Sequence, residues 1–183
     1  YAEATYLRRR GVPTWGVFTD KSKQGGGPLI DIGTHALDLT LFMMNNYDVD
    51  YVVGTSFEKL GQLLDPEHQG QINSRGEQDN WNNKTYDVED SAIGHIKMKN
   101  GATIVLEASW ALNSLDVDEA KTSLCGTKAG ADMKDGLRIN GERSSKMYVT
   151  KPDLEAGGVA FYDGSVKDAK DVEAEQFYAA LEN

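Results

Sequence analysis

An acid and an imidazole stand four residues apart in an otherwise apolar segment. Asp31 and His35 are about one helical turn apart, and Asp38 follows three residues later, so on a helix all three project from one side. A carboxylate and an imidazole that are buried without partners destabilise the fold. We therefore expect the polar stripe formed by Asp31, His35 and Asp38 to pair, to bind a ligand or to line a cavity.

Three hypotheses explain the stripe from residue types and spacing. In the first, His35 is a general base for a substrate hydroxyl, because imidazole titrates near neutral pH, and Asp31 orients the substrate or the ring. In the second, Asp31, His35 and Asp38 ligate a metal ion in a hydrolase or isomerase. In the third, His35 is a buried structural histidine capped by an acid. Spacing alone favours the third, because helical His/Asp pairs are usually structural.

The stripe lies on a helix that we predict over residues 28–44. Pro28 suits a first helical turn, apolar residues recur at helical spacing, and Asn45 and Asn46 stop the pattern. The segment 11–28 has the composition of a loop and ends in three glycines, which let the backbone approach a neighbour closely. A loop therefore leads into the helix.

Strand patterns precede and follow this helix. The predicted strands cover residues 1–10, 48–60, 90–110, 122–126, 136–139 and 146–150, and a second helix begins at about residue 168. Residues 61–87 form a long polar segment without periodicity; a loop of this length is usually functional or disordered, and the residue pattern does not indicate which role it has. The order of elements suits an α+β fold with a largely antiparallel sheet.

The strongest strand signal is a hairpin around Asn100 and Gly101, a favoured two-residue turn. Such a turn pairs Met98 with Thr103, Ile96 with Val105, and His95 with Leu106. Both faces of the hairpin then carry apolar side chains. We therefore expect helices on one face of the sheet and another layer, such as a second subunit, on the other.

Composition limits the classes of partner. The 183 residues carry 19 Lys and Arg against 29 Asp and Glu, a net charge of −10, which disfavours nucleic acid and anionic membranes as partners. No apolar run approaches the roughly 18 residues that a membrane span needs. The single cysteine, Cys125, cannot form an internal disulfide, so a cytoplasmic location is expected.

The residues around the stripe form a longer signature. The string GGGPLIDIGTHALDLTLFMM, residues 25–44, resembles the signature of the C-terminal domain of the Gfo/Idh/MocA oxidoreductase family, in which a glycine run leads into a helix with acid and imidazole positions. The strings EATYLRRRGVPTWG and YDVEDSAIGHIKMKNGATIVLEASWA, residues 3–16 and 86–111, resemble that family's first strand and central hairpin. The resemblance covers residues 1–141 and weakens afterwards.

The resemblance implies an NAD- or NADP-dependent oxidoreductase that acts on a sugar, inositol or related polyol. In that family the positions matching Asp31 and His35 are catalytic, and the histidine takes the hydroxyl proton while hydride moves to the cofactor. The implied fold is an open-faced, largely antiparallel sheet with helices on one face, of the type found in the C-terminal domain of glyceraldehyde-3-phosphate dehydrogenase-like enzymes. A non-catalytic binding domain with this fold remains an alternative.

Three further residues are candidates for substrate binding. Arg9 and Arg10 belong to a short basic run that could meet a carboxylate or phosphate, although such runs are more often solvated. Trp15 could stack on the apolar face of a sugar, or pack against the first strand.

The sequence contains no GxGxxG motif after a strand, and Gly25 to Gly27 have a different spacing. We therefore expect residues 1–183 to be a single substrate-binding and oligomerisation domain, truncated from a larger two-domain enzyme and lacking its Rossmann domain. Such a chain should neither bind NAD(P) tightly nor turn over by itself, and no metal is expected. It should form a homo-oligomer through the open face of its sheet.

Overall fold

The computed structural model describes residues 1–63, 83–115, 117, 120–152 and 169–181. They belong to two compact units, Tyr1–Thr150 and Lys151–Asn183. The described part of the second unit is the helix α3, Ala169–Leu181, in which the rings of Phe177 and Tyr178 meet edge to face at 5.8 Å. This confirms the helix predicted from about residue 168. None of the helices in the described ranges has the length and apolar composition needed to cross a membrane.

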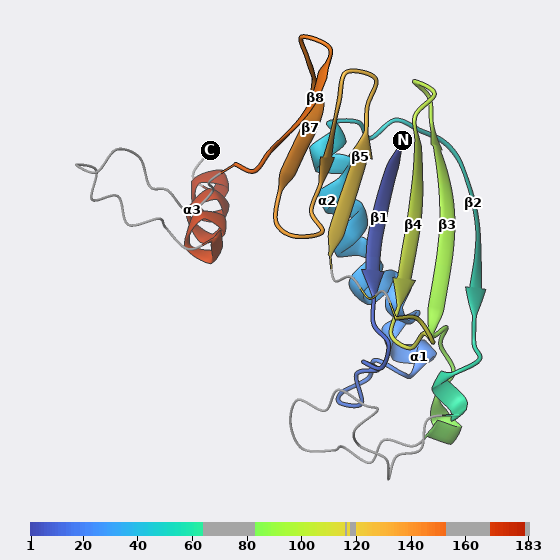
Figure 1. Cartoon of the computed structure of the whole chain (residues 1–183). Helices are drawn as coiled ribbons and strands as arrows, with labels where there is room; N and C mark the ends of the chain where they lie inside the picture. Colours follow the sequence, from blue (N-terminus) through green and yellow to red (C-terminus); the bar gives the residue numbers. More distant parts are fainter. Residues whose placement is uncertain (64–82, 116, 118–119, 153–168, 182–183) are drawn as a thin grey trace. The chain divides into compact units, whose positions relative to one another are not determined.

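The first unit is built on one eight-stranded sheet with the order β2-β3-β4-β1-β5-β6-β7-β8 (Figure 1). The strands are β1 Ala2–Leu7, β2 Val49–Phe57, β3 Ser91–Met98, β4 Thr103–Ser109, β5 Lys121–Cys125, β6 Ala129–Asp132, β7 Arg138–Arg143 and β8 Lys146–Thr150. Every neighbouring pair is antiparallel except β1 and β4, which are parallel. The predicted α+β fold with a largely antiparallel sheet is therefore confirmed.

The predicted helix over 28–44 is present but has two parts. Its first turn, Leu29–Gly33, is π-helical, and the α-helix α2, Thr34–Met44, continues it. The backbone of Asn45 turns left-handed, at φ 46°, and its N–H donates to carbonyls of the last helical turn, which ends the helix. The predicted boundaries are confirmed, and the widened first turn is a feature that the apolar spacing did not indicate.

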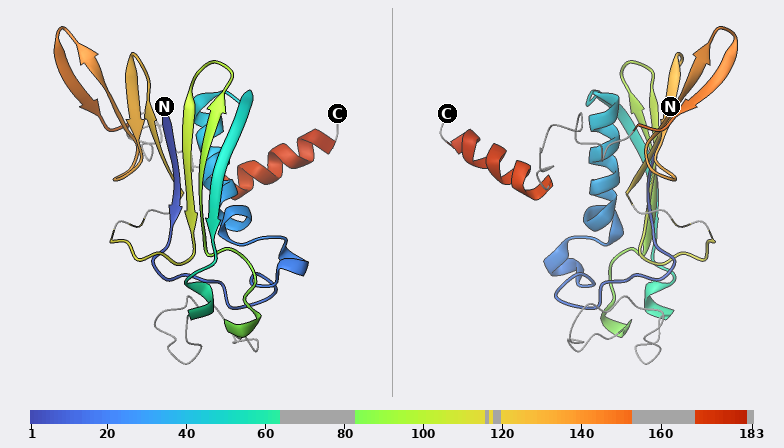
Figure 2. Two further views of the ribbon diagram at one scale, coloured as in Figure 1. Left: turned by 90° about the vertical axis from the view of Figure 1, so that its right-hand side faces the viewer. Right: turned by 60° about the vertical axis from the view of Figure 1, so that its left-hand side comes forward.

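Helix α2 lies over one face of the sheet (Figure 2). In the described part of Tyr1–Thr150, the shorter helices α1 Lys21–Gln24, η2 Gly61–Leu63 and η4 Asn83–Thr85 lie near one end of the sheet, and none of them covers its opposite face (Figures 1 and 2). Within the described residues of this unit, the sheet is therefore open on one side, as expected.

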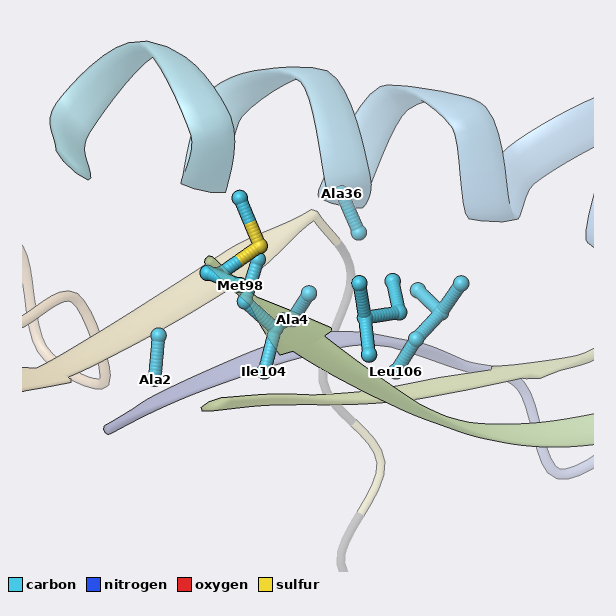
Figure 3. Packing of buried hydrophobic residues seen from close by; sticks show 7 residues of the cluster. Ala2, Ala4, Ala36, Met98, Ile104 and Leu106 are labelled. Atoms are coloured by element: carbon cyan, nitrogen blue, oxygen red, sulfur yellow. The ribbon is translucent and has the colours of Figure 1, made fainter. Parts of the chain in front are cut away.

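The main core lies between α2 and the central strands (Figure 3). Its buried members are Ala2, Ala4, Ala36, Ile96, Met98, Ile104 and Leu106. The small side chain of Ala36 points from the helix toward the sheet, so the two layers can approach closely at this position (Figure 3). The buried hydroxyls of Thr40 and Thr122, 2.8 Å apart, join α2 to β5 by a hydrogen bond.

The register predicted for the central hairpin is wrong by one residue. The observed partners are Lys97 and Thr103, Ile96 and Ile104, and His95 and Val105. The connection contains three residues and not two, because Gly101 adopts a left-handed conformation with φ 90° and its N–H donates to the carbonyl of Met98.

A shift of one residue exchanges the faces of a strand. Ile104 and Leu106 therefore lie in the core with Ile96 and Met98, whereas His95 lies on the open face opposite Val105. Both faces of the hairpin carry apolar side chains, as expected, because Ile93 lies on the open face with His95; the correction concerns which residues of β4 share a face with those of β3.

The remaining strand predictions are confirmed in β1, β2, β5, β7 and β8. Strand β6, Ala129–Asp132, was not predicted, because its sequence AGAD lacks the β-branched and aromatic residues typical of strands. Within the polar segment 61–87, residues 64–82 lie outside the described ranges.

Candidate active site

The polar stripe begins where two strands end together. Strands β1 and β4 are parallel, and the backbone segments that follow them remain hydrogen-bonded to each other. The backbone N–H of Arg8 donates to the carbonyl of Ser109, and the backbone N–H of Gly11 donates to the carbonyl of Trp110. The loop after β1 and the start of the helix lie at this same end of the sheet (Figure 1). The candidate residues around Arg9 and Asp31 are therefore brought to one region.

The glycine run fixes where the helix begins. A Cβ on Gly27 would clash with the backbone carbonyl oxygen of Glu89, so only glycine fits this approach. The Glu89 carboxylate accepts a hydrogen bond from the Leu29 N–H at 3.3 Å, which places a negative charge at the positive end of the helix. The Tyr86 hydroxyl in turn donates to the Glu89 carbonyl at 3.1 Å. The helix start is thus held by the segment that leads into β3.

Asp31 is half-buried in the π-helical turn and is bonded to the end of β4. The indole Nε1 of Trp110 donates to the Asp31 Oδ2 at 2.9 Å, and Trp110 itself is fully buried. A Cβ on Gly33 would lie 3.1 Å from the Cβ of Ala108, so glycine at this position lets the helix lie close to β4. That approach brings Asp31 within reach of Trp110.

An aromatic row extends from Trp110 into the loop after β1. Phe18 meets the ring of Trp110 edge-on at a centroid distance of 6.3 Å, and Trp15 meets Phe18 at 5.8 Å. Trp15 is half-buried. The predicted candidates Trp15 and Asp31 are therefore connected by two buried or half-buried rings.

His35 and Asp38 are exposed on the surface of α2. The expectation that the stripe is desolvated is therefore wrong for these two residues, and so is the hypothesis of a buried structural histidine. The expectation assumed that the apolar helix is buried all round within this chain, whereas only Ile32, Ala36 and Thr40 of its side chains are fully buried. The described residues hold no group of three or more His, Cys, Asp or Glu side chains that could bind a metal ion.

The arginines of the basic run have different surroundings. Arg9 is exposed. Arg10 donates through Nη2 to the Asn113 Oδ1 at 2.6 Å, which ties the loop after β1 to the loop after β4. Arg8 lies over the ring of Tyr6 and donates to its hydroxyl at 3.1 Å.

Comparison with models of known protein families identifies the family of this chain. Residues 1–132 match the model of the GFO/IDH/MocA C-terminal domain, a stretch that contains β1, the glycine run, the helix with Asp31 and His35, and the central hairpin. The chain belongs to the Gfo/Idh/MocA family. The resemblance seen in the sequence is thereby confirmed.

Two curated relatives of this Gfo/Idh/MocA chain are named as a dehydrogenase and as an oxidoreductase subunit. D-glucoside 3-dehydrogenase of Escherichia coli strain K12 is 45% identical over 130 residues, which are 71% of the chain and 34% of that protein. A putative UDP-kanosamine synthase oxidoreductase subunit of Amycolatopsis mediterranei strain S699 is 31% identical over 149 residues, 80% of the chain and 40% of that protein. The chain thus spans roughly a third to two fifths of the length of these relatives.

Solved structures share the fold of this Gfo/Idh/MocA domain. Levoglucosan dehydrogenase in complex with NADH and levoglucosan aligns with a TM-score of 0.58 at 18% identity, over 94% of this chain and 48% of that one. UDP-N-acetylglucosamine 3-dehydrogenase from Acidithiobacillus ferrooxidans aligns with a TM-score of 0.58 at 17% identity, over 99% of this chain and 45% of that one. At these identities the likeness establishes the fold.

Sequence reasoning did not single out the residues that support this Gfo/Idh/MocA site. Trp110 and Glu89 were read only as parts of the hairpin, and no pattern indicates that Trp110 reaches an acid 79 positions away. Asp90 is buried, and its Oδ2 accepts hydrogen bonds from the backbone N–H groups of Lys59, Leu60 and Gly61 at 2.6, 2.5 and 3.0 Å. The adjacent acids Glu89 and Asp90 before an apolar strand were the one visible signal.

Burial raises the pKa of the Tyr86 phenol well above its ordinary value near 10, and the neighbouring carboxylates, Asp90 first, raise it further. Tyr86 therefore stays neutral throughout the ordinary pH range. Its hydroxyl supports the helix start through Glu89.

Proposed function

We propose that this chain is the substrate-binding and catalytic domain of an NAD(P)-dependent dehydrogenase that oxidises a secondary hydroxyl of a sugar or related polyol. The observation that supports the proposal is that one helix carries both a carboxylate held by a hydrogen bond and an exposed imidazole. Trp110 holds the Asp31 carboxylate, and His35 is exposed four residues further on. In a family of oxidoreductases, this is the arrangement that alcohol oxidation needs.

His35 is the proposed acid/base. The hydroxyl proton of the substrate moves to the imidazole, the carbon–oxygen double bond forms, and the hydrogen on that carbon leaves with its electron pair as hydride. Asp31 accepts a hydrogen bond from the substrate or from the imidazole and so orients the hydroxyl toward His35. In the reverse direction the same imidazole returns the proton.

The nicotinamide, when bound to the whole protein, is the hydride acceptor in this proposal. The residues of this chain do not fit a dinucleotide site, because no GxGxxG motif follows a strand in its sequence. The cofactor would therefore be held mainly by another domain of a longer protein. Leu29 and Ile30, 40% and 47% exposed beside Asp31, form an apolar surface that such a domain would cover.

The proposed substrate class follows from the relatives and from the loop after β1. Trp15 is half-buried and offers a ring face on which the apolar side of a sugar can stack. Arg9 is exposed and free to reach substrate oxygens, whereas the guanidinium of Arg10 already donates to Asn113. We propose that Trp15, Arg9 and Arg10 line the substrate site, with Arg10 acting chiefly by holding the two loops together.

We also propose that the protein forms a homo-oligomer through the open face of the sheet. Val53 and Ile93 are 63% and 44% exposed on neighbouring strands of that face. Beside them lies an apolar hollow of about 360 Å³ whose lining includes Leu7, Phe57 and Ile93. A second copy would bury these side chains, as exposed apolar patches usually do at interfaces. The free, exposed Cys125 is compatible with the cytoplasmic location that we propose.

The full-length protein provides the test of this function. It should be incubated with NAD+ or NADP+ and a panel of glycosides, free sugars and inositols, and reduction followed by nicotinamide absorbance. We expect reduction with at least one sugar or polyol, and we expect no tight NAD(P) binding to the isolated chain by calorimetry. Failure of the whole panel with both cofactors would overturn the proposal.

A further inference from the structure

We propose that Trp110 is a positioning residue for the Asp31 carboxylate, so that its indole N–H fixes which carboxylate oxygen faces the substrate. This inference rests on the proposed function, because it assigns a role within the same site. The Trp110 Nε1 donates to Oδ2 of Asp31 at 2.9 Å. Among the described residues, Oδ1 accepts no hydrogen bond, so it is the oxygen left for the substrate or for His35.

Trp110 is held on several sides, which is what a positioning residue needs. Its side chain is fully buried in the cluster at the end of β4, and its ring meets Phe18 edge-on at 6.3 Å. Its backbone N–H donates to the carbonyl of Asp90 at 3.0 Å, and its carbonyl accepts from Gly11 at 2.8 Å. The indole N–H therefore points in a fixed direction.

The acceptor of the Trp110 indole N–H is a carboxylate, and this indicates a role beyond satisfying a buried donor. A buried indole N–H needs one partner, and any backbone carbonyl would satisfy it. Here the partner is a half-buried carboxylate on a π-helical turn, a local geometry that recurs at functional sites. A hydrogen bond to a charged acceptor is stronger and more directional than one to a neutral group. Trp110 thus restrains the rotation of the Asp31 side chain.

Gly33 and Ala108 make the contact possible. A side chain at position 33 would meet the Ala108 Cβ at 3.1 Å, and glycine there allows the helix to lie close to β4. The π-helical turn then places Asp31 above Trp110. The small residues Gly33 and Ala108 thus allow the close approach on which the contact between Asp31 and Trp110 depends.

The test uses the full-length protein and separates the effect of losing the indole N–H of Trp110 from the effect of losing the packing of its ring. Trp110 is replaced by 3-benzothienylalanine, whose sulfur takes the place of the indole N–H in a ring of nearly the same shape, and by phenylalanine. We expect kcat to fall about 10- to 100-fold in both variants, with KM changing less than about threefold, since ring packing is retained in the first. A drop in thermal stability with unchanged kcat would overturn the positioning role.

A double-mutant cycle gives a second readout that a purely structural role would not move. In an Asp31→Asn background, Trp110→Phe should lower kcat no further, because the group that it positions is already changed. Tyr86→Phe, another buried aromatic of the same cluster, should act equally in both backgrounds. Equal effects of Trp110→Phe in both backgrounds would contradict the inference.

Failure of the inference can be distinguished from failure of the proposed function. The indole ¹⁵N–¹H resonance of Trp110 reports the hydrogen bond without any turnover, and we expect it to shift in Asp31→Asn. An active wild type with an unmoved resonance would overturn the inference and leave the function standing. A shifted resonance in a wild type that oxidises no sugar would support the contact and overturn the proposed function, and with it any catalytic role of Trp110.

Discussion

Gly27 meets the backbone carbonyl of Glu89 so closely that no side chain fits between them. The same glutamate accepts the N–H of Leu29 with its carboxylate. Together these contacts fix the position at which the helix begins, and the helix carries Asp31 and His35. The glycine run therefore acts on the site through the placement of the helix.

Replacing Gly27 by alanine should destabilise the chain. The added Cβ must displace backbone at Glu89, and overpacking of this kind costs about 1 to 3 kcal/mol. Urea unfolding followed by circular dichroism measures the change in the free energy of unfolding. Gly94→Ala is the matched control, because its Cβ would meet the nearest atom, the Leu106 Cβ, at an ordinary 3.8 Å. An equal effect of both substitutions would contradict the account of the helix start.

Asp90 should be one of the most sensitive polar positions of the fold. Asp90→Ala removes a buried carboxylate and leaves the backbone N–H groups of Lys59, Leu60 and Gly61 without their acceptor, the last of them buried, so we expect a loss of about 2 to 4 kcal/mol in the free energy of unfolding. Asp48→Ala removes an exposed carboxylate from the turn before β2 and should change stability by less than about 0.5 kcal/mol. Chemical denaturation of both variants at one pH makes the comparison, and a small effect at Asp90 would show that solvent replaces its hydrogen bonds.

Tyr86 should make the fold sensitive to alkali. Burial raises its pKa in the folded state above the ordinary value near 10, so above pH 10 the unfolded chain releases this proton while the folded chain keeps it. The free energy of unfolding should therefore fall as the pH rises past 10, by up to about 1.4 kcal/mol per pH unit from this residue. Unfolding curves between pH 8 and 11 measure the slope. Tyr86→Phe should reduce it, and Tyr47→Phe, which removes an exposed hydroxyl, should leave it in place.

The open face of the sheet should control assembly. A lysine at Val53 or Ile93 places a charge in the proposed interface, where desolvation is costly. Sedimentation velocity should show the wild type as an oligomer and these variants as smaller species. Phe42→Lys introduces the same charge on helix α2, at a residue 71% exposed, and should leave the oligomer intact. A monomeric wild type at high concentration would refute the interface.

Local sequence signals were enough to predict the helices and strands, whereas the arrangement of the candidate site depends on contacts between residues far apart in the sequence. Pro28 and Asn45 bound the helix, and Asn100 with Gly101 marked the hairpin. The hairpin register was missed by one residue because the left-handed Gly101 closes a three-residue connection as readily as glycine closes a two-residue one.

The pairing of β1 with β4, and the bond from Trp110 to Asp31, join segments separated by about 100 and 79 residues. No local periodicity contains such information. Asp31 and His35 were found through their types and spacing, whereas the residue that holds Asp31 became visible only once the two strand ends lay side by side. The exposure of His35 was misjudged because one apolar helix was assumed to be covered entirely by its own chain.

The role of His35 is tested most directly by the steady-state kinetics of the full-length His35→Ala variant with the sugar that the wild type oxidises. Because His35 is exposed on α2, the variant should fold with wild-type stability, and kcat should fall about 10²- to 10⁴-fold, as expected for the loss of a general base. Asp48→Ala, which removes an exposed charged side chain before β2, outside α2 and outside the open face of the sheet, is the control and should retain wild-type kcat. A His35→Ala enzyme with unchanged kcat would contradict the account.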